Sequence, residues 1–224
     1  MNAQFEMDKL LSDPGVKGKT LLLHACCAPC SSYVLTYLRS TFRITVLYFN
    51  PNITAEEEYW KRAKEEQRFI DALNRQLSGD EEYYPIQYVD GRYEPSEFLE
   101  AVKGYEDCPE RGERCTICFR MRLEETAKYA AGNGFDYFAT TLTLSPLKNT
   151  DLLNRIGQEE GEKYNVAYLP SDFKKKGGYQ RSIELSKEYD LYRQDFCGCA
   201  FSKAERERQK NINLERGTKN GETT

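Results

Sequence analysis

Seven of the eight cysteines in this chain stand in three closely spaced groups, and the chain has a single histidine. Hydrolytic zinc sites draw on several imidazoles, so this ratio excludes most of them, along with every catalytic scheme that needs two histidines. Thiolate chemistry remains, as metal ligation or as dithiol redox chemistry. An isolated cysteine such as Cys108 fits the role of a small buried hydrophobic residue, whereas closely spaced cysteines fit it poorly.

The first group lies in the segment His24-Ala-Cys-Cys-Ala-Pro-Cys30, where a leucine-rich strand ends and a helix begins. Free amides at a helix start favour a thiolate or another anion. Cys27 and Cys30 alone have the spacing of a thioredoxin-type motif, but the adjacent Cys26 is surplus to a dithiol pair. We therefore interpret the group as ligands of a metal or cluster, with simple redox or structural thiols as the alternative.

The second group is Cys115 and Cys118, at the start of a helical pattern. Residues at i and i+3 of a helix share one face, so both sulfurs point the same way. This spacing is common among ligands of zinc and of iron-sulfur clusters. Together with Cys26 and Cys27, the pair supplies the four thiolates that a tetrahedral zinc or a cubane cluster requires.

The third group is Cys197-Gly-Cys199. Two cysteines one residue apart can close a small disulfide ring, for which glycine gives the backbone its freedom. Such a strained disulfide is easily reduced, which indicates a redox-active pair. The alternative is two further metal ligands.

Length and charge limit the remaining possibilities. The chain has 224 residues, enough for one ordinary α/β domain, and a net charge of −4. A nucleic-acid partner must therefore be bound by a local basic patch. No secretory or membrane-spanning stretch is visible, so we expect a cytoplasmic protein without a membrane partner, in which cysteines serve metal or redox chemistry and not a disulfide framework.

Apolar periodicity predicts short strands that alternate with longer helices. The expected strands are Thr20–Ala25, Ile44–Phe49, Ile86–Val89, Tyr137–Thr141 and Val166–Leu169. The expected helices are Thr54–Leu77, Glu97–Val102, Ile117–Ala131 and Asp151–Tyr164. Thr54 is expected to cap its helix, with Glu57 in capping-box spacing. The pattern predicts an α/β fold with a mainly parallel Rossmann-like (HUP-like) sheet flanked by helices, and cysteine-bearing loops and helices at its carboxyl edge.

We expect a single catalytic domain over residues 20–203, preceded by an N-terminal extension over residues 1–19. Residues 204–224 are polar and are expected to form a C-terminal tail, frayed from Asn211 onward.

The combined motifs resemble epoxyqueuosine reductase of the QueH family over about Thr20 to Ser202. The shared segments are His24-Ala-Cys-Cys-Ala-Pro-Cys30, Tyr48-Phe-Asn-Pro-Asn52, Cys115-x-x-Cys118 with Arg122-Leu123, Thr140-Thr-Leu-Thr-Leu-Ser-Pro-Leu-Lys148, Asp172-Phe-Lys-Lys-Lys-Gly-Gly-Tyr179 and Tyr192-Arg-Gln-Asp-Phe-Cys-Gly-Cys199.

This resemblance implies an oxidoreductase that removes the epoxide oxygen of epoxyqueuosine at the wobble position of tRNA, the last step of queuosine synthesis. It implies a 4Fe-4S cluster and an additional mononuclear iron, with an unidentified electron donor as a further partner. Cys197 and Cys199 would then be the redox-active pair, and Cys30 would either ligate the second iron or only line the site. The implied cluster ligands are Cys26, Cys27, Cys115 and Cys118.

The departing oxygen needs a proton donor. Four side chains qualify because each lies by a predicted strand end or beside a cysteine motif: Asp172, Asp195, Asp90 and His24. We name Asp172 as the catalytic candidate, and a helix cap or a structural hydrogen bond is the alternative for each of the four.

The segment from Lys174 to Arg181 is the predicted tRNA contact. Its cations can meet backbone phosphates and Tyr179 can stack on a splayed base, whereas the alternative is a solvated basic loop. The predicted phosphate contacts are Lys174, Lys175, Lys176 and Arg181.

Two rival functions use the same cysteines. The first is a thiol-disulfide oxidoreductase built on Cys27-Ala-Pro-Cys30 with a structural zinc site, and the second is a non-enzymatic zinc module. Iron and sulfide in the purified protein favour the reductase, whereas stoichiometric zinc favours a rival.

Overall fold

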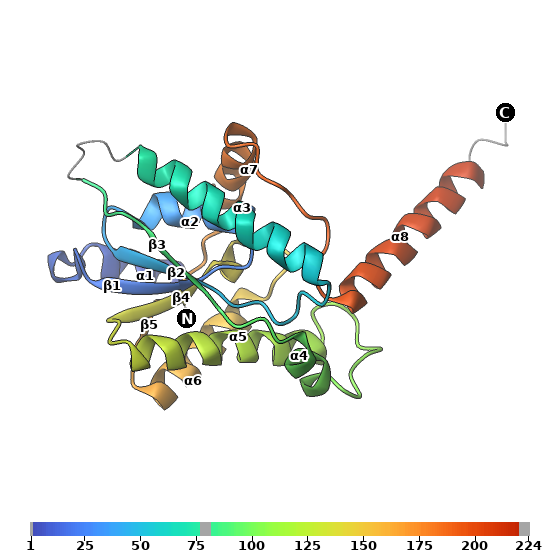
Figure 1. The fold of residues 1–224 in the computed structure, drawn as a ribbon, viewed down its shortest axis with the longest axis horizontal. Helices are drawn as coiled ribbons and strands as arrows, with labels where there is room; N and C mark the ends of the chain where they lie inside the picture. The colour runs from blue at the N-terminus through green and yellow to red at the C-terminus, as the bar shows by residue number, and fades with distance from the viewer. Residues whose placement is uncertain (1, 77–81, 220–224) are drawn as a thin grey trace.

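The computed structural model describes residues 2–76 and 82–219, and the side chains as far as residue 213. Its centre is a five-stranded sheet in the order β3-β2-β1-β4-β5, with every neighbouring pair parallel (Figure 1). The strands are β1 (Thr20–His24), β2 (Arg43–Tyr48), β3 (Gln87–Asp90), β4 (Tyr137–Thr140) and β5 (Ala167–Tyr168). The predicted α/β fold with a parallel Rossmann-like sheet is confirmed.

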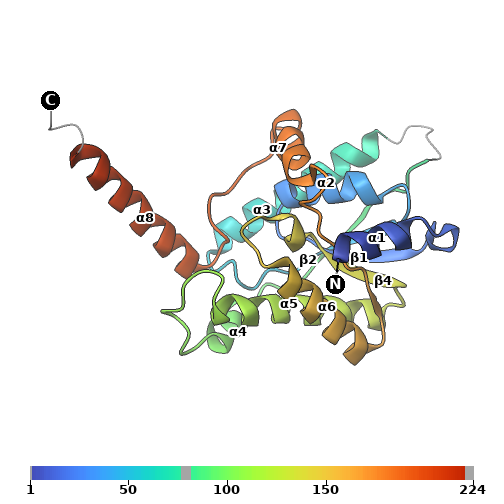
Figure 2. The ribbon, with the colours of Figure 1, turned by 180° about the vertical axis from the view of Figure 1, so that it is seen from behind.

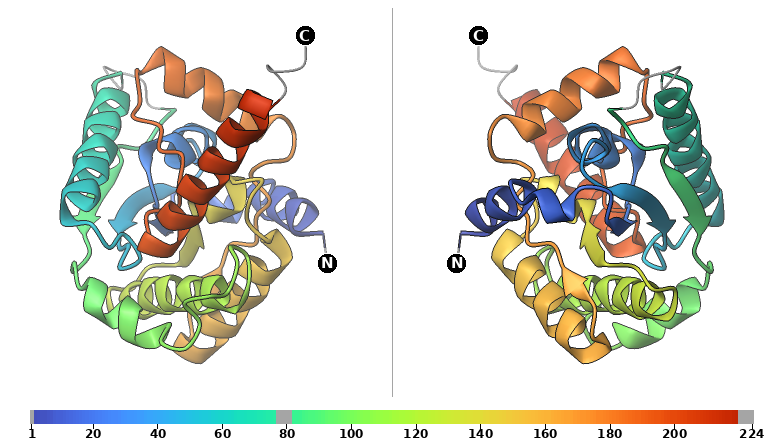
Figure 3. Two further views of the ribbon diagram at one scale, coloured as in Figure 1. Left: turned by 90° about the vertical axis from the view of Figure 1, so that its right-hand side faces the viewer. Right: turned by 90° about the vertical axis from the view of Figure 1, so that its left-hand side faces the viewer.

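Helices cover both faces of the sheet, as the end-on views in Figure 3 show. Helices α2, α3 and α7 lie on one face, and α5 and α6 lie on the other (Figures 1 and 2). The helices are α1 (Ala3–Leu11), α2 (Ala28–Leu38), α3 (Glu56–Arg75), α4 (Pro95–Ala101), α5 (Glu113–Gly132), α6 (Thr150–Tyr164), α7 (Gly178–Glu188) and α8 (Ala200–Lys219), with short 3-10 turns at η1 (Pro14–Val16) and η2 (Thr141–Leu144).

The sequence of the central strand β1 explains why helices cover both faces of the sheet. Its consecutive leucines are all fully buried, with Leu21 and Leu23 in the core under α2 and α3, and Leu22 in the core under α5 and α6. Such a continuous apolar run is typical of a parallel strand buried on both faces. The strand order reverses between β1 and β4, and open α/β sheets place their ligand sites at the carboxyl ends of the strands on either side of such a reversal.

All five predicted strands are present, but the predicted capping box at Thr54 is wrong. Helix α3 begins at Glu56, and Ala55 occupies the N-cap position without a side-chain hydrogen bond. The backbone N–H of Thr54 instead donates to the carbonyl of Gly198 at 3.3 Å. Three consecutive glutamates in the first turn favour the helix start through the helix dipole.

The two ends of the chain are more helical than predicted. In the N-terminal extension, α1 buries Met7 in the core beneath α2 and α3. At the other end, α8 continues to Lys219, so the frayed tail expected from Asn211 is wrong for residues 211–219, and its last residues lie outside the described part of the chain. Helix α8 projects away from the body (Figures 1 and 2).

Over the described residues, no helix combines the length and the apolar character that crossing a bilayer requires.

A buried carboxyl group lies beneath α3. Glu66 is completely buried, and neither of its oxygens accepts a hydrogen bond from any described residue. Burial raises the pKa of this carboxyl from 4.5 to about 8, although the nearby Ser31 hydroxyl acts in the opposite direction. The carboxyl is therefore protonated in the native state at neutral pH and ionised in the unfolded chain.

Because of this difference, the free energy of unfolding falls as the pH rises from about 4.5 to about 8. Above pH 8 the loss is complete. We expect Glu66→Gln to increase the free energy of unfolding at pH 8.5, by at most about 5 kcal/mol, and to change little at pH 4.5. Urea unfolding at several pH values checks this, with Glu57→Gln on the exposed side of α3 as the control. If Glu66→Gln increases the free energy of unfolding by the same amount at all pH values, ionisation of Glu66 is not the cause.

Candidate metal and redox site

The first cysteine group lies where the strand order reverses. Cys26 and Cys27 follow β1, and Cys30 is in the first turn of α2. The three sulfur atoms lie within 4.8 Å of one another, the only group of three or more metal-ligating side chains found in the described part of the chain. The N–H of Cys26 donates to the hydroxyl of Thr141, directly after β4, at 3.4 Å. The loops after β1 and β4 thus position this group together, as the strand order predicts.

The three thiols influence one another strongly. The Sγ atoms of Cys26 and Cys27 are 3.8 Å apart. Hydrogen bonds from Cys27 and Cys30, assisted by the Lys148 ammonium, hold the pKa of Cys26 well below its usual value. Hydrogen bonds with Cys26 and Cys27, together with burial, raise the pKa of Cys30. The group therefore stabilises a negative charge on sulfur, as a metal ligand requires.

This group lies in the wall of a cavity of about 330 Å³. The other walls come from segments far apart in the sequence: α3, α5 and the loop before it, η2 and the loop after it, α7, the segment between α7 and α8, and α8 itself. The lining residues that the site uses are Cys26, Cys27, Cys30, Arg62, Arg122, Lys148 and Cys197.

The second and third cysteine groups meet in a small adjoining cavity. Cys115 and Cys118, on the first turns of α5, line it together with Cys197 and Cys199. Burial raises the pKa of Cys118 to about 12 and that of Cys199 to about 11. Because Cys197 lines both cavities, it lies between the predicted ligands on α5 and the group at the start of α2.

Two cations stand among the three cysteine groups. Lys148 Nζ donates to Cys197 Sγ at 3.4 Å, and Arg122 is 1% exposed with one guanidinium nitrogen, Nη2, left without a partner. Neither has a carboxylate within ion-pair distance among the described residues. Burial would lower both pKa values, but the nearby cysteine sulfurs outweigh it and raise them. Arg122 is buried and Lys148 is half-buried, and a cation withdrawn from water without a carboxylate partner requires a compensating anion. The cysteine sulfurs are the groups that raise both pKa values, so they fit this role.

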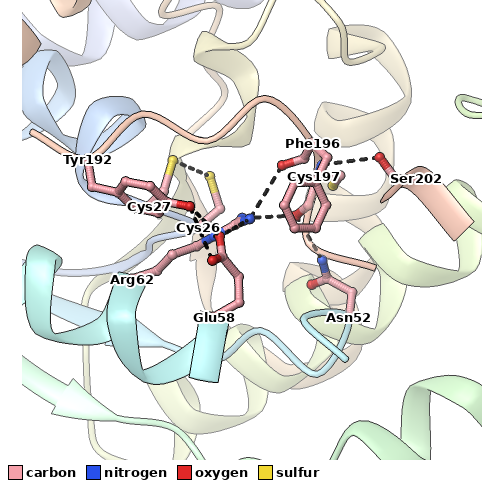
Figure 4. A network of polar contacts seen from close by, with 9 residues as sticks. All are labelled: Cys26, Cys27, Asn52, Glu58, Arg62, Tyr192, Phe196, Cys197 and Ser202. Atoms are coloured by element: carbon pink, nitrogen blue, oxygen red, sulfur yellow. Dashed lines mark hydrogen bonds and ion pairs between the residues drawn. The ribbon is translucent and has the colours of Figure 1, made fainter. Parts of the chain in front are cut away.

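The loop of the third group is fixed through its backbone (Figure 4). Arg62 donates to the carbonyls of Cys197 at 3.2 Å and Phe196 at 3.5 Å, and Glu58 holds the guanidinium at 2.7 Å. Asn52 donates to the same Cys197 carbonyl at 3.4 Å. The position of Cys197 is thus set from α3 and from the loop after β2.

Gly198 gives this loop its shape. Its φ of +116° lies in a region that residues with a side chain rarely adopt, and an added Cβ would lie 2.8 Å from Ile53. Both flanking cysteines contact Ser202: the N–H of Cys197 donates to its hydroxyl at 3.2 Å, and its N–H donates to Cys199 Sγ at 3.3 Å. The two cysteines are present as free thiols.

The predicted proton donors lie in different surroundings. His24 is fully buried outside the cavity, with Nδ1 2.9 Å from the Thr140 hydroxyl and Nε2 3.1 Å from the Phe49 carbonyl. A carbonyl only accepts, so Nε2 carries the proton, and burial lowers the pKa of the ring to about 4. His24 therefore ties β1 to β4 and β2 as a neutral ring.

The three carboxylates also have partners. Asp172 pairs with Lys174 at 3.2 Å and does not line the cavity. Asp90 accepts from the Tyr88 hydroxyl at 2.8 Å. Asp195 lines the cavity and pairs with Lys210 of α8 at 2.6 Å.

Each cation of the predicted tRNA segment has an acidic partner within the chain. Lys174 and Lys175 pair with Asp172, Lys176 pairs with Asp8, and Arg181 pairs with Glu184 and Glu188. Tyr179, in contrast, lines the main cavity and is 37% exposed.

Sequence reasoning gave no role to Arg62, Arg122 or Lys148. Arg62 resembles its exposed neighbours on α3, and the only available signal is that it lies on the buried helix face of Tyr59 and Ala63. Lys148 has no local signal because its surroundings come from the loop at Cys197. Cys108 lines neither cavity, in agreement with its lack of an assigned role.

Comparison with solved structures shows the same fold in a protein of distant sequence. The U34-tRNA thiolase NcsA from Methanococcus maripaludis, solved with its 4Fe-4S cluster, matches with a TM-score of 0.52 and 14% identity. The match covers 89% of this chain and 67% of that protein.

Closer relatives are found by sequence. Epoxyqueuosine reductase QueH of Staphylococcus epidermidis is 45% identical over 184 residues, which cover 81% of this chain and 75% of that protein. Epoxyqueuosine reductase QueH of Thermotoga maritima is 37% identical over 202 residues, covering 88% and 98%. The family described as Epoxyqueuosine reductase QueH matches residues 21–205, which confirms the predicted resemblance and the predicted oxidoreductase class. The chain belongs to the epoxyqueuosine reductase QueH family.

Proposed function

We propose that this chain is an epoxyqueuosine reductase, which converts epoxyqueuosine at the wobble position of tRNA to queuosine. Family membership gives the reaction class. The observation that carries the proposal further is that Cys197 lies between two cysteine groups and forms a wall of the cavity of about 330 Å³. A reducing pair is thus next to a space in which a modified nucleoside can be held.

We further propose that Cys26, Cys27, Cys115 and Cys118 hold a 4Fe-4S cluster, and that Cys30 binds an additional iron. The donor set fits such a group, since it offers only sulfur, which iron-sulfur clusters take. The charges fit as well: a cubane cluster with four thiolates is an anion, and Arg122 and Lys148 are cations without carboxylate partners. When bound, such a centre supplies electrons singly, and an iron acts as a Lewis acid toward an epoxide oxygen.

The electron balance gives Cys197 and Cys199 a defined role. Removing an epoxide oxygen breaks two C–O bonds, forms a C=C bond and consumes two electrons and two protons, with the oxygen leaving as water. Two thiols that close to a disulfide release two electrons and two protons. The sum is epoxide plus dithiol to alkene, disulfide and water, and an external reductant must then reopen the disulfide.

The surrounding side chains prepare this pair. Lys148 hydrogen-bonds to Cys197 Sγ and so helps to hold this sulfur at the cavity wall. Arg62 and Asn52 hold the Cys197 carbonyl and limit the positions that the sulfur can take. Asp172 remains the predicted proton donor, and tRNA contact by Lys174, Lys175, Lys176 and Arg181 remains a prediction, although both require the present ion pairs to open.

An anaerobic assay tests the function. Iron-loaded protein is incubated with tRNA that contains epoxyqueuosine and a chemical reductant, and the nucleosides are analysed by mass spectrometry. We expect queuosine to form, and protein without iron to form none. If the Thermotoga maritima relative converts the same tRNA and this chain does not, the proposed activity is wrong.

The metal content of the purified protein distinguishes the proposed reductase from the two rival functions. Three sulfur atoms within 4.8 Å of one another, in place of a single pair, favour ligation over a simple dithiol at Cys27 and Cys30. Stoichiometric zinc together with insulin reduction would support the thiol-disulfide oxidoreductase, and zinc without that activity would support a structural module.

A further inference from the structure

The opening of the cavity of about 330 Å³, called the main cavity here, is lined by exposed side chains of several chemical kinds. Eight exposed side chains line it, and the five used here come from the loop after η2, from α7, from the segment between α7 and α8, and from α8. We call this set the mouth; its members are Leu147, Tyr179, Arg193, Arg206 and Gln209. Leu147 is 53% exposed and Tyr179 is 37% exposed, so an apolar group and an aromatic ring both face solvent at one opening.

The two arginines of the mouth differ from the other cations near it. Arg193 donates to the hydroxyl of Ser186 at 3.0 Å. Neither Arg193 nor Arg206 forms an ion pair with a carboxylate of the described residues, whereas Lys174 to Lys176 and Arg181 all do. The two guanidinium groups therefore keep donors available to an anion that approaches the cavity.

Carboxylates also line the cavity, and two of the three have partners. Asp195 pairs with Lys210 at 2.6 Å, and Glu205 accepts the N–H of Glu110 at 3.1 Å. Helix α8, which carries Arg206 and Lys210, has six basic and three acidic residues in a chain whose net charge is −4. The projecting helix is thus rich in basic residues, and its Arg206 and Gln209 line the cavity.

We propose that the mouth receives the anticodon loop of the tRNA, with Arg193 and Arg206 on backbone phosphates that flank the nucleotide in the cavity, and Tyr179 stacked on a neighbouring base. This inference rests on the proposed function and names the residues that present the substrate. Single-stranded RNA loops are recognised through splayed bases stacked on aromatic rings, and phosphates through arginine forks. A cavity of about 330 Å³ is at the lower end of the range for small-ligand sites, so it holds one nucleoside and leaves the rest of the loop outside.

The position of Tyr179 supports this assignment. Tyr179 is exposed and directly follows Gly178, the first residue of α7. Because Gly178 has no side chain, the helix can start in close contact with Phe173 and Tyr33. An added Cβ would lie 2.0 Å from the Phe173 carbonyl oxygen. The close approach holds the first turn of α7 firmly against α2. The ring of Tyr179 is therefore presented by a fixed element, which reduces the entropy lost when a base stacks on it.

Binding of a fluorescent anticodon stem-loop RNA to iron-loaded protein, measured by anisotropy over a series of salt concentrations, tests the proposal. We expect the Arg193→Ala/Arg206→Ala variant to weaken binding about tenfold, and to lower the slope of log affinity against log salt by about 1.4. Tyr179→Ala should weaken binding about tenfold with an unchanged slope, and Tyr179→Phe should bind as the unmodified protein does.

The matched control removes two other exposed cations that line neither cavity, as Lys128→Ala/Lys187→Ala, and should leave affinity and slope unchanged. The triple variant Lys174→Ala/Lys175→Ala/Lys176→Ala is measured in the same series. An unchanged slope in the arginine variant, or a loss found only in the lysine variant, overturns the proposal.

The same proteins separate this inference from the proposed function. In the conversion assay, the arginine variant should raise the KM for tRNA with little change in kcat. If the unmodified chain converts tRNA and the mouth variants do so with the same KM, the mouth is wrong and the function stands. If the unmodified chain converts nothing but binds the stem-loop through these arginines, the function is wrong and the mouth stands.

Discussion

Cys118→Ser is expected to remove most of the iron and sulfide from the protein, and to lower turnover on epoxyqueuosine-containing tRNA by at least about a hundredfold. Loss of a residue that only supports a metal ligand costs about 10- to 100-fold, so loss of a ligand should reach at least the upper end. A serine hydroxyl is a poor substitute because it is far less acidic than a thiol and offers a hard oxygen in place of a soft sulfur. Iron and sulfide analysis, visible absorbance and the nucleoside assay measure the effect.

The position of Cys118 makes this variant more informative than one at Cys26 or Cys27. The group at the start of α2 is already assembled by its own three sulfurs, whereas Cys118 lies across the site on α5. A loss of iron in Cys118→Ser therefore shows that both helices hold one centre. It also accounts for the otherwise uncompensated charge of Arg122, whose Nε donates to the Cys118 carbonyl at 3.2 Å.

Cys108→Ser is the matched control. Cys108 belongs to the same segment of sequence but lines neither cavity, so its replacement should leave iron content and turnover unchanged. If Cys118→Ser keeps its iron and its activity, the assignment of ligands on α5 is wrong, and the centre is held by Cys26, Cys27 and Cys30 alone.

The sequence was sufficient for the sheet and for the grouping of cysteines, for a physical reason. Strands such as β1 are buried on both faces, so their apolar runs are continuous and visible without any knowledge of their neighbours. The motif at Cys26 follows β1 directly, and its place at the carboxyl edge follows from the strand alone. Features fixed by their own segment could therefore be predicted.

Features that depend on contacts between distant segments could not be predicted from the sequence. Thr54 and Glu57 have the spacing of a capping box, but the Gly198 carbonyl binds the Thr54 N–H and the helix starts later. The lysines after Asp172 look like a free basic patch, yet their partners lie on Asp172 itself and on α1. Arg62 was overlooked because the carbonyl that it binds lies 135 residues further along the chain.

The same distinction applies to α8. Its sequence is polar and lacks a clear apolar stripe, so periodicity predicts no helix, and most of its side chains over residues 200–213 are exposed. Its beginning is fixed by Ser202, which is hydrogen-bonded to both Cys197 and Cys199. Helix α8 thus links the position of these two cysteines to the residues Arg206 and Gln209 that line the cavity.

The second large effect is expected from Cys197→Ala, which should lower multiple-turnover conversion by about a hundredfold or more while iron and sulfide remain at the level of the unmodified protein. The reason is the electron balance: without Cys197, the disulfide with Cys199 cannot form, and each turnover lacks the two-electron step that a dithiol supplies. Cys197 also carries the hydrogen bond from Lys148, so the alanine variant alone does not separate redox chemistry from positioning.

Cys197→Ser separates the two roles. Serine keeps an acceptor for the Lys148 ammonium and nearly the size of the thiol, but it forms no disulfide. If Cys197 acts as a reductant, serine and alanine lose activity equally. If it serves only to hold Lys148, serine retains most of the activity and the redox assignment is wrong.

Thiol counting completes the test without depending on turnover rates. Protein reduced beforehand and then freed of reductant should convert at most about one epoxyqueuosine per chain by the dithiol route, and should lose two titratable thiols as it does so. Either variant should lose none. Conversion by the unmodified protein with all thiols retained would mean that both electrons come from elsewhere in the site, and that Cys197 and Cys199 line the cavity for a reason other than reduction.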